Sequence, residues 1–213
     1  MATTISGTSG VTFPAGGVGN PAGAVVGTTD TQTLTNKTLT SPTVNSPTIG
    51  GTPVMGASVI TSGTSVASTS GTSIDFTSIP SWVKRITVLF SNVSTTGTSP
   101  VLIQVGSGSV TTTGYASSGT VSDSIGNNPA FTTGLVLSAL STAAQSRTGS
   151  MTLFLLGSNT WIGNCTVASV AAGPSGYAAG YTPALGGALD RVRITTVAGT
   201  DTFDAGSINI LYE

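Results

Sequence analysis

Residues 82–93 read WVKRITVLFSNV, and apolar side chains recur at every second position through Ile86, Val88 and Phe90. Such a period of two places these side chains on one face and is typical of a half-buried β-strand. Residues 191–194, Arg-Val-Arg-Ile, alternate charged and apolar side chains in the same way. We therefore expect both stretches to be strands that contribute to a hydrophobic core.

Other short apolar stretches, separated by Gly, Pro or Asn, fill the rest of residues 72–213. They cover residues 101–105, 110–115, 134–140, 151–156, 161–170 and 208–212. Closely spaced strands with turn residues between them are typical of a β-sandwich or a jelly roll. No stretch has the period of 3.6 residues that a helix needs. We predict an all-β chain whose residues 72–213 form a sandwich or jelly-roll-like domain.

The chain is almost uncharged, with six basic and seven acidic side chains among 213 residues. Its charged fraction is 6%, whereas a soluble domain has roughly 25%. The net charge of −1 and the lack of a basic cluster argue against nucleic-acid binding. No apolar run approaches the roughly 18 residues of a membrane span, so membrane insertion is not expected. The single cysteine, Cys165, excludes an internal disulfide framework.

Residues 31–60 carry an apolar side chain at every fifth position. The six positions are Leu34, Leu39, Val44, Ile49, Val54 and Val59. Pro42, Pro47 and Pro53 break a helix, and a strand would place alternate members of this series on opposite faces. One apolar residue in five cannot build a core within one chain, but several copies wound around a common axis can. We predict a fibrous stem in a homotrimer. A flexible Thr/Ser/Pro-rich linker is the alternative.

Two further segments have low sequence complexity. Residues 1–30 are rich in Gly, Thr and Ala and have too little apolar surface to order themselves. They fit either an extended anchor peptide held by another protein or a flexible tail. Residues 61–71 are rich in Ser, Thr and Gly and are expected to be a hinge.

The sequence offers little for catalysis. It contains no histidine, which removes the commonest general base, the Ser-His-Asp and Cys-His systems and most zinc sites. Cys165 lies in an apolar stretch and is expected to be a buried small hydrophobe. Enzymes that cleave glycans use two carboxylates, and Asp201 and Asp204 are close in sequence, but aspartates commonly cap turns. We predict no enzyme activity and no catalytic, cofactor-binding or metal-binding residue.

The aromatic residues are the candidates for binding. Most are expected in the core, including Trp82, Phe90, Phe154 and Trp161. Residues 173–183 form a predicted Gly/Pro-rich loop with two tyrosines, and tyrosine suits contacts with sugars or with another protein. Possible receptor or partner contacts are Tyr115, Tyr177 and Tyr181. Alternatively, the two loop tyrosines fold back onto the domain or are buried at the trimer interface. Residues 122–128 are a further candidate loop.

Two stretches resemble segments of phage structural proteins. Residues 29–43, TDTQTLTNKTLTSPT, resemble a segment that recurs in tail-fibre and related virion proteins of tailed phages, usually before a β-rich tip. Residues 79–88, IPSWVKRITV, are similar to the start of a domain seen in phage structural proteins. The resemblance implies a homotrimeric fibre on the virion, attached by its N-terminus to a tail, baseplate, neck or capsid protein. It transfers no catalytic residue.

Three functions follow as hypotheses. The first is a structural virion fibre that contacts a glycan or protein of the host surface, with weak contacts added together by multivalency. The second is a capsid- or neck-attached decoration protein without a receptor. The third is a small glycan-degrading tip.

Overall fold

The computed structural model describes residues 4–6, 10–12, 38, 40, 43, 45, 60–122, 128–139, 143, 145–169 and 173–213. The chain divides into two units, Met1–Val54 and Met55–Glu213. In the first unit, β1 (Thr4–Ser6) pairs with β2 (Gly10–Thr12) in antiparallel orientation. The following predicted axis residues lie outside the described residues, so the stem stays a prediction: Leu34, Leu39, Val44, Ile49, Val54 and Val59.

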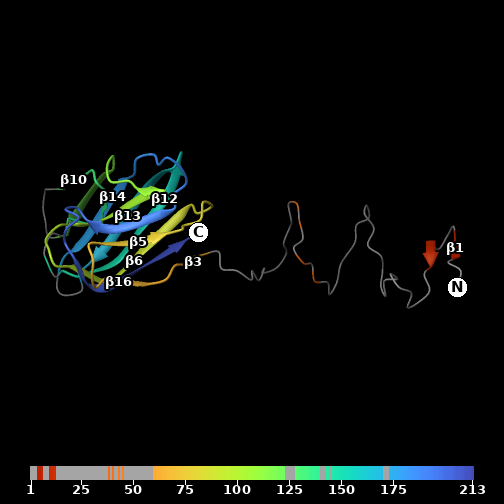
Figure 1. Cartoon of the computed structure of the whole chain (residues 1–213), viewed down its shortest axis with the longest axis horizontal. Helices are drawn as coiled ribbons and strands as arrows, with labels where there is room; N and C mark the ends of the chain where they lie inside the picture. The colour runs from red at the N-terminus through yellow and green to blue at the C-terminus, as the bar shows by residue number, and fades with distance from the viewer. Residues whose placement is uncertain are drawn as a thin grey trace. The chain divides into compact units, whose positions relative to one another are not determined.

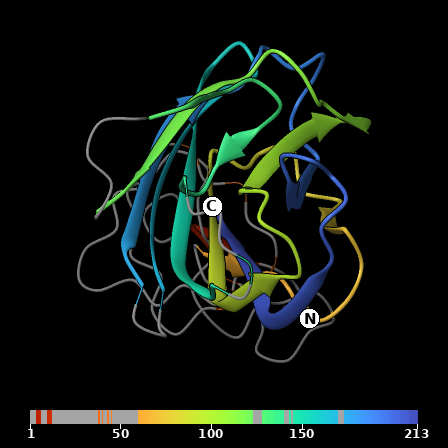
Figure 2. The same ribbon diagram turned by 90° about the vertical axis from the view of Figure 1, so that its left-hand side faces the viewer.

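The second unit is a sandwich of two antiparallel sheets (Figures 1 and 2). The larger sheet has the strand order β10-β9-β14-β13-β12-β6-β16-β3, and β4 also pairs with β16. Its strands are β3 (Thr61–Ser62), β4 (Val66–Ala67), β6 (Arg85–Thr95), β9 (Ala116–Val121), β10 (Ala130–Phe131), β12 (Arg147–Gly157), β13 (Thr160–Ala168), β14 (Ser175–Tyr181) and β16 (Phe203–Tyr212).

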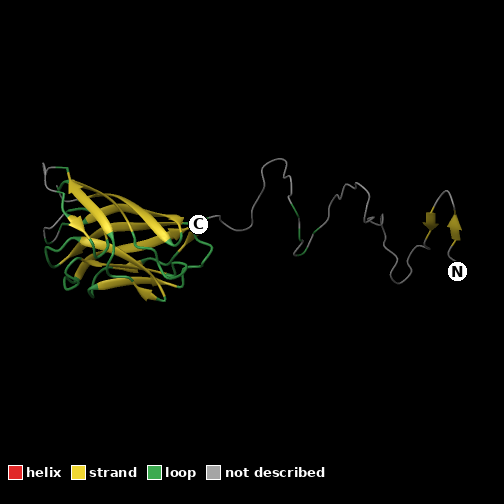
Figure 3. Ribbon diagram, turned by 90° about the horizontal axis from the view of Figure 1, so that it is seen from above, coloured by secondary structure: helices red, strands yellow, loops and turns green. Residues whose placement is uncertain are grey.

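The smaller sheet has the order β11-β7-β15-β5, and β8 pairs with β7. Its strands are β5 (Ser73–Thr77), β7 (Val101–Ser107), β8 (Ser109–Val110), β11 (Leu135–Val136) and β15 (Arg191–Thr196). Every regular element in the described part of the chain is a strand (Figure 3). The prediction of an all-β, sandwich-like domain is therefore confirmed.

The core lies between the sheets and is built from alternating side chains. In β6, Ile86, Val88 and Phe90 are buried, as the sequence pattern predicts. In β13 burial alternates without interruption, and Trp161, Cys165 and Val167 point inward. Side chains of the smaller sheet complete this core, among them Ile74, Phe76, Ile103, Val105, Val192 and Ile194.

The predicted hinge at residues 61–71 is wrong, because β3 and β4 belong to the sandwich. Both pair with β16 at the edge of the larger sheet. The backbone N–H of Gly63 donates to the Ile210 oxygen at 2.8 Å, and that of Ser68 donates to the Gly206 oxygen at 2.9 Å. Backbone pairing needs no apolar side chains, so composition did not reveal it. The domain therefore begins about ten residues earlier than predicted.

Two of the aromatic residues expected in the core are exposed. Phe90 and Trp161 are buried, whereas Trp82 is 54% exposed and Phe154 is 43% exposed. Phe154 follows the inward-facing Leu153 in β12, so its side chain points to the outer face of the sheet. Trp82 precedes β6 and packs against Tyr212, with ring centroids 5.9 Å apart.

Candidate contact surface

The two tyrosines predicted to be in a loop lie on a strand. Residues 175–181 form β14, between β9 and β13 in the larger sheet. Its inward positions are Gly176, Ala178 and Gly180. A Cβ on Gly176 would come within 2.3 Å of the Ser138 Cβ. Small residues are needed at these inward positions because neighbouring segments approach β14 closely. As a result, the sequence of β14 lacks the alternation of apolar and polar residues that is typical of a strand.

Tyr177 and Tyr181 point outward from β14 and are 49% and 54% exposed. Tyr177 lies opposite Thr166 of β13 and Thr120 of β9. Tyr181 lies opposite Ile162 of β13. Neither tyrosine folds back into the core of this chain. Tyr177 and Tyr181 are four residue steps apart on the strand, which is about 13 Å along the sheet.

The surroundings of Tyr177 are uncharged and include small Ser, Thr and Asn side chains. A hollow beside its ring is lined by Ser118, Thr120, Asn128 and Ala179. The sequences of β9, β13 and β14 contain no charged residue. The surface therefore offers hydroxyl and amide groups around an exposed aromatic ring, which suits a neutral, hydroxyl-rich ligand.

The surroundings of Tyr181 are apolar. Phe154 of β12 lies opposite Ile162 of β13, which in turn lies opposite Tyr181. Leu156, which is 68% exposed, lines one hollow together with Thr160, Ile162 and Tyr181. Sequence reasoning missed Ile162 and Leu156. The signal for Ile162 is present in TWIGNCTV at 160–167, because Trp161 and Cys165 point inward and so turn Ile162 outward.

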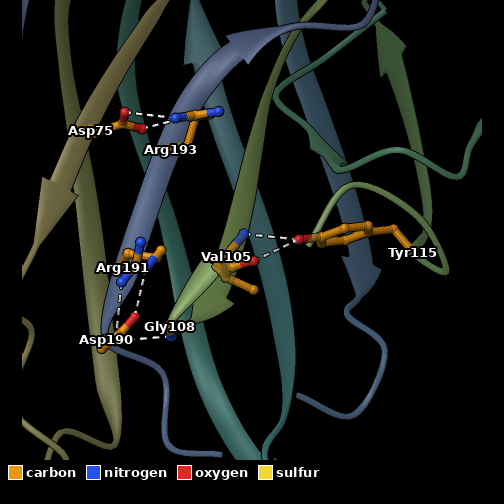
Figure 4. Close-up of polar contacts among 7 residues, drawn as sticks. All are labelled: Asp75, Val105, Gly108, Tyr115, Asp190, Arg191 and Arg193. Atoms are coloured by element: carbon orange, nitrogen blue, oxygen red, sulfur yellow. Dashed lines mark hydrogen bonds and ion pairs between the residues drawn. The ribbon is translucent and has the colours of Figure 1, made fainter. Parts of the chain in front are cut away.

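The prediction that Tyr115 contacts a receptor or partner is wrong. Its side chain is only 3% exposed. Its hydroxyl group accepts a hydrogen bond from the Val105 N–H at 2.8 Å (Figure 4). The hydroxyl group also donates to the Thr111 oxygen at 2.9 Å. Burial raises the pKa of this phenol to about 12, although the hydrogen bond to Val105 lowers it. Tyr115 is therefore a core residue with a satisfied polar group. The other candidate loop, residues 122–128, lies largely outside the described residues.

Charged residues gather on the smaller sheet (Figure 4). Arg193 of β15 donates two hydrogen bonds to Asp75 of β5, at 2.7 and 2.8 Å. Arg191 donates to Asp190, which also accepts from the Gly108 N–H at 3.0 Å. The hydrogen bond from Arg191, followed by that from Gly108, holds the pKa of Asp190 below its usual value. These contacts tie β15 to β5 and to the turn between β7 and β8.

The remaining candidate chemical groups have structural partners. Cys165 is 5% exposed, and burial raises the pKa of its thiol to about 12, so the prediction of a buried hydrophobe is confirmed. Asp201 accepts from the Ser99 N–H at 2.8 Å, and Asp204 accepts from the Ser94 hydroxyl. Within the described ranges, no group of three or more His, Cys, Asp or Glu side chains could hold a metal ion. No helix of these ranges has the length and apolar character that a membrane crossing requires.

Arg147 is a buried cation at the start of β12. Its side chain is 1% exposed, and burial lowers its pKa to about 10. Its Nη1 donates to the Gln145 oxygen at 3.2 Å. We assign it a structural role at this end of the strand.

Comparisons with protein-family models, with curated proteins and with solved structures find no match to this chain.

Proposed function

We propose that this chain is a structural fibre protein of a phage-type virion, without enzyme activity, that works as a homotrimer. Residues 1–30 attach it to a virion protein of the tail, baseplate, neck or capsid. Residues 31–60 form the extended fibrous stem. The sandwich domain, with a jelly-roll-like path of the chain, contributes to adhesion at the host surface.

One observation carries the adhesive part of the proposal. Tyr177 presents a half-exposed aromatic ring within an uncharged sheet face that includes the side chains of Ser118, Thr120 and Asn128. A ring of this kind stacks on the apolar face of a sugar or on another protein, and its neighbours supply hydrogen bonds. One such contact is weak. Three copies on each fibre and several fibres on each particle raise the effective strength by avidity.

The fibre is tested by the solution mass of the full-length chain, measured by light scattering. We expect the mass of three chains. The triple variant Leu39→Asp, Val44→Asp and Ile49→Asp should reduce the mass to that of one chain, because it places three charges at each level of the shared axis. The matched control, Thr38→Asp, Thr43→Asp and Thr48→Asp, adds the same charges one residue earlier and should stay trimeric. A wild-type mass of one chain would refute the fibre and make residues 31–60 a linker.

Adhesion is tested separately by binding of the full-length protein to a panel of immobilised neutral polysaccharides. We expect Tyr177→Ala to reduce binding at least about tenfold, which corresponds to the loss of roughly 1.4 kcal/mol per fibre. Val66→Ala, at an exposed position on β4, serves as the control and should bind like the wild type. A trimer that binds none of these polysaccharides overturns the glycan contact, and leaves a host protein or the decoration role as the alternatives.

A further inference from the structure

The chain enters the sandwich at one end of the larger sheet. β3 begins at Thr61, which pairs with Tyr212 near the end of β16. Tyr212 pairs with Ile86 at the start of β6, and the neighbouring Arg85 pairs with Phe154 near the end of β12. The C-terminus and β3 consequently lie at the same end of the domain (Figure 1). We call this the stem end, because residues 31–59 connect to it directly.

The same end collects the last residues of the other strands. Phe154 pairs with Ile162, and Ile162 pairs with Tyr181 at the end of β14. Leu156 follows Phe154, and Trp82 packs against Tyr212. Strands from distant parts of the chain thus bring exposed apolar residues to the same end of the domain.

Most of the exposed large apolar side chains of the described residues are at the stem end. They are Ile60 (42% exposed), Trp82 (54%), Phe154 (43%), Leu156 (68%), Ile162 (41%) and Tyr181 (54%). We call these six residues the stem-end patch. Phe154, Leu156, Ile162 and Tyr181 adjoin one another on the larger sheet, and Ile60 and Trp82 lie beside Tyr212 at the same end. Monomeric soluble proteins rarely expose large contiguous groups of apolar residues, and such groups mark an interaction surface.

Part of the charge at the stem end is compensated within the chain. Arg85 forms an ion pair with Glu213 of the same chain, and Lys84 lies beside them. The hollow formed by Leu156, Ile162 and Tyr181 contains no charged side chain. Two apolar surfaces of this kind gain free energy when they remove each other from water.

We propose that the stem-end patch packs against other copies of this chain, so that the trimer interface continues from the stem into the sandwich. The proposal rests on the trimeric stem proposed above. The last position of the five-residue repeat, Val59, directly precedes Ile60, the first residue of the patch. Copies that meet at Val59 therefore hold their stem ends together at high effective concentration. A different partner would have to compete with neighbours already in place.

Protection of a new thiol tests this interface in the full-length protein. Leu156→Cys introduces a thiol in the patch, and Val197→Cys introduces one beside Pro100, at the other end of β6. Cys165 gives a low background, because it is buried and its pKa is raised to about 12. In the single chain Leu156 is more exposed than Val197, at 68% against 37%. We nevertheless expect maleimide to label Leu156→Cys at least about tenfold more slowly than Val197→Cys.

Two further variants test whether slow labelling is caused by contact between copies. Ile162→Cys is a second patch variant and should be protected in the same way. The Asp variant of Leu39, Val44 and Ile49 should restore fast labelling at residue 156, because it separates the copies. Circular dichroism confirms that each variant keeps its β-structure.

The outcomes separate this inference from the proposed function. A trimer with slow labelling at residue 156 supports both. A trimer in which Leu156→Cys reacts as fast as Val197→Cys overturns the interface and leaves the fibre standing. A full-length mass of one chain overturns the fibre and the interface together, and slow labelling in that case would mean that the chain covers its own patch.

Discussion

The Tyr115 hydroxyl group and the backbone of Val105 form hydrogen bonds inside the sandwich. The Val105 N–H donates to the hydroxyl oxygen at 2.8 Å, and the Val105 carbonyl oxygen lies 3.2 Å from it (Figure 4). The contact joins the residue that precedes β9 to the middle of β7. A side chain from the segment leading into the larger sheet thus satisfies backbone groups of the smaller sheet.

The variant Tyr115→Phe should destabilise the domain. It keeps the ring but leaves the buried Val105 N–H without its acceptor, which costs about 1–3 kcal/mol of the free energy of unfolding. Urea unfolding measures the difference. Tyr177→Phe removes the same hydroxyl group from an exposed ring and should change stability by less than about 0.5 kcal/mol. Equal effects of the two variants would contradict the buried contact.

Stability should fall in alkaline solution. Burial raises the pKa of the Cys165 thiol from 9.0 to about 12 and that of Tyr115 from 10.0 to about 12. At a pH below the pKa that each group has in the unfolded chain, both groups are neutral in the folded and the unfolded state. Their contribution to stability is then fully present. Above pH 9 to 10 the unfolded chain loses these protons first, and stability declines until about pH 12.

Urea midpoints at pH 8, 10 and 11 measure this decline. Cys165→Ala should flatten the decline, because it removes one of the two groups whose deprotonation favours the unfolded chain. Arg147, whose pKa burial lowers to about 10, acts in the opposite direction above that pH. A midpoint that does not change between pH 8 and 11 would contradict the burial of both groups.

Gly180→Ala should destabilise β14. A Cβ at this inward position would lie 2.4 Å from the Ser117 Cβ and 2.5 Å from the Ala116 oxygen. Because backbone must shift to accept it, we expect a loss of about 1–3 kcal/mol. Ala179→Val is the matched control, since Ala179 points outward, and it should be tolerated within about 0.5 kcal/mol. If Ala179→Val lost more stability than Gly180→Ala, the assignment of inward and outward residues in β14 would be wrong.

The ion pair between Asp75 and Arg193 should contribute little to stability. The two side chains are 38% and 36% exposed, so water screens them despite the two short hydrogen bonds. A double-mutant cycle with Asp75→Asn and Arg193→Gln should give a coupling energy below about 1 kcal/mol. The coupling should shrink further in 1 M salt, where the screening length is about 3 Å. A coupling of several kcal/mol that salt leaves unchanged would contradict the assigned exposure.

Alternation along the sequence predicts the strands whose inward residues are large. β6, β12, β13 and β15 follow this rule, because each places a series of apolar side chains in the core. The rule fails for β9 and β14, whose inward residues include Ser117, Gly119, Gly176 and Gly180. Close approach of neighbouring segments selects small residues there, so those strands have no apolar pattern to detect. The composition of residues 173–183 consequently predicts a loop, although Tyr177 and Tyr181 lie on β14.

The sequence by itself determined the all-β fold class and the residues that point inward from the major strands. Low charge, the absence of a helical period and local alternation depend on neighbouring residues only, and these features required an all-β core. Only the tertiary structure decided which outward residues meet. Phe154, Ile162 and Tyr181 come together because β12, β13 and β14 pair in one register. The pairing of β3 and β4 with β16 and the burial of Tyr115 depend in the same way on contacts between distant segments, which no local pattern encodes.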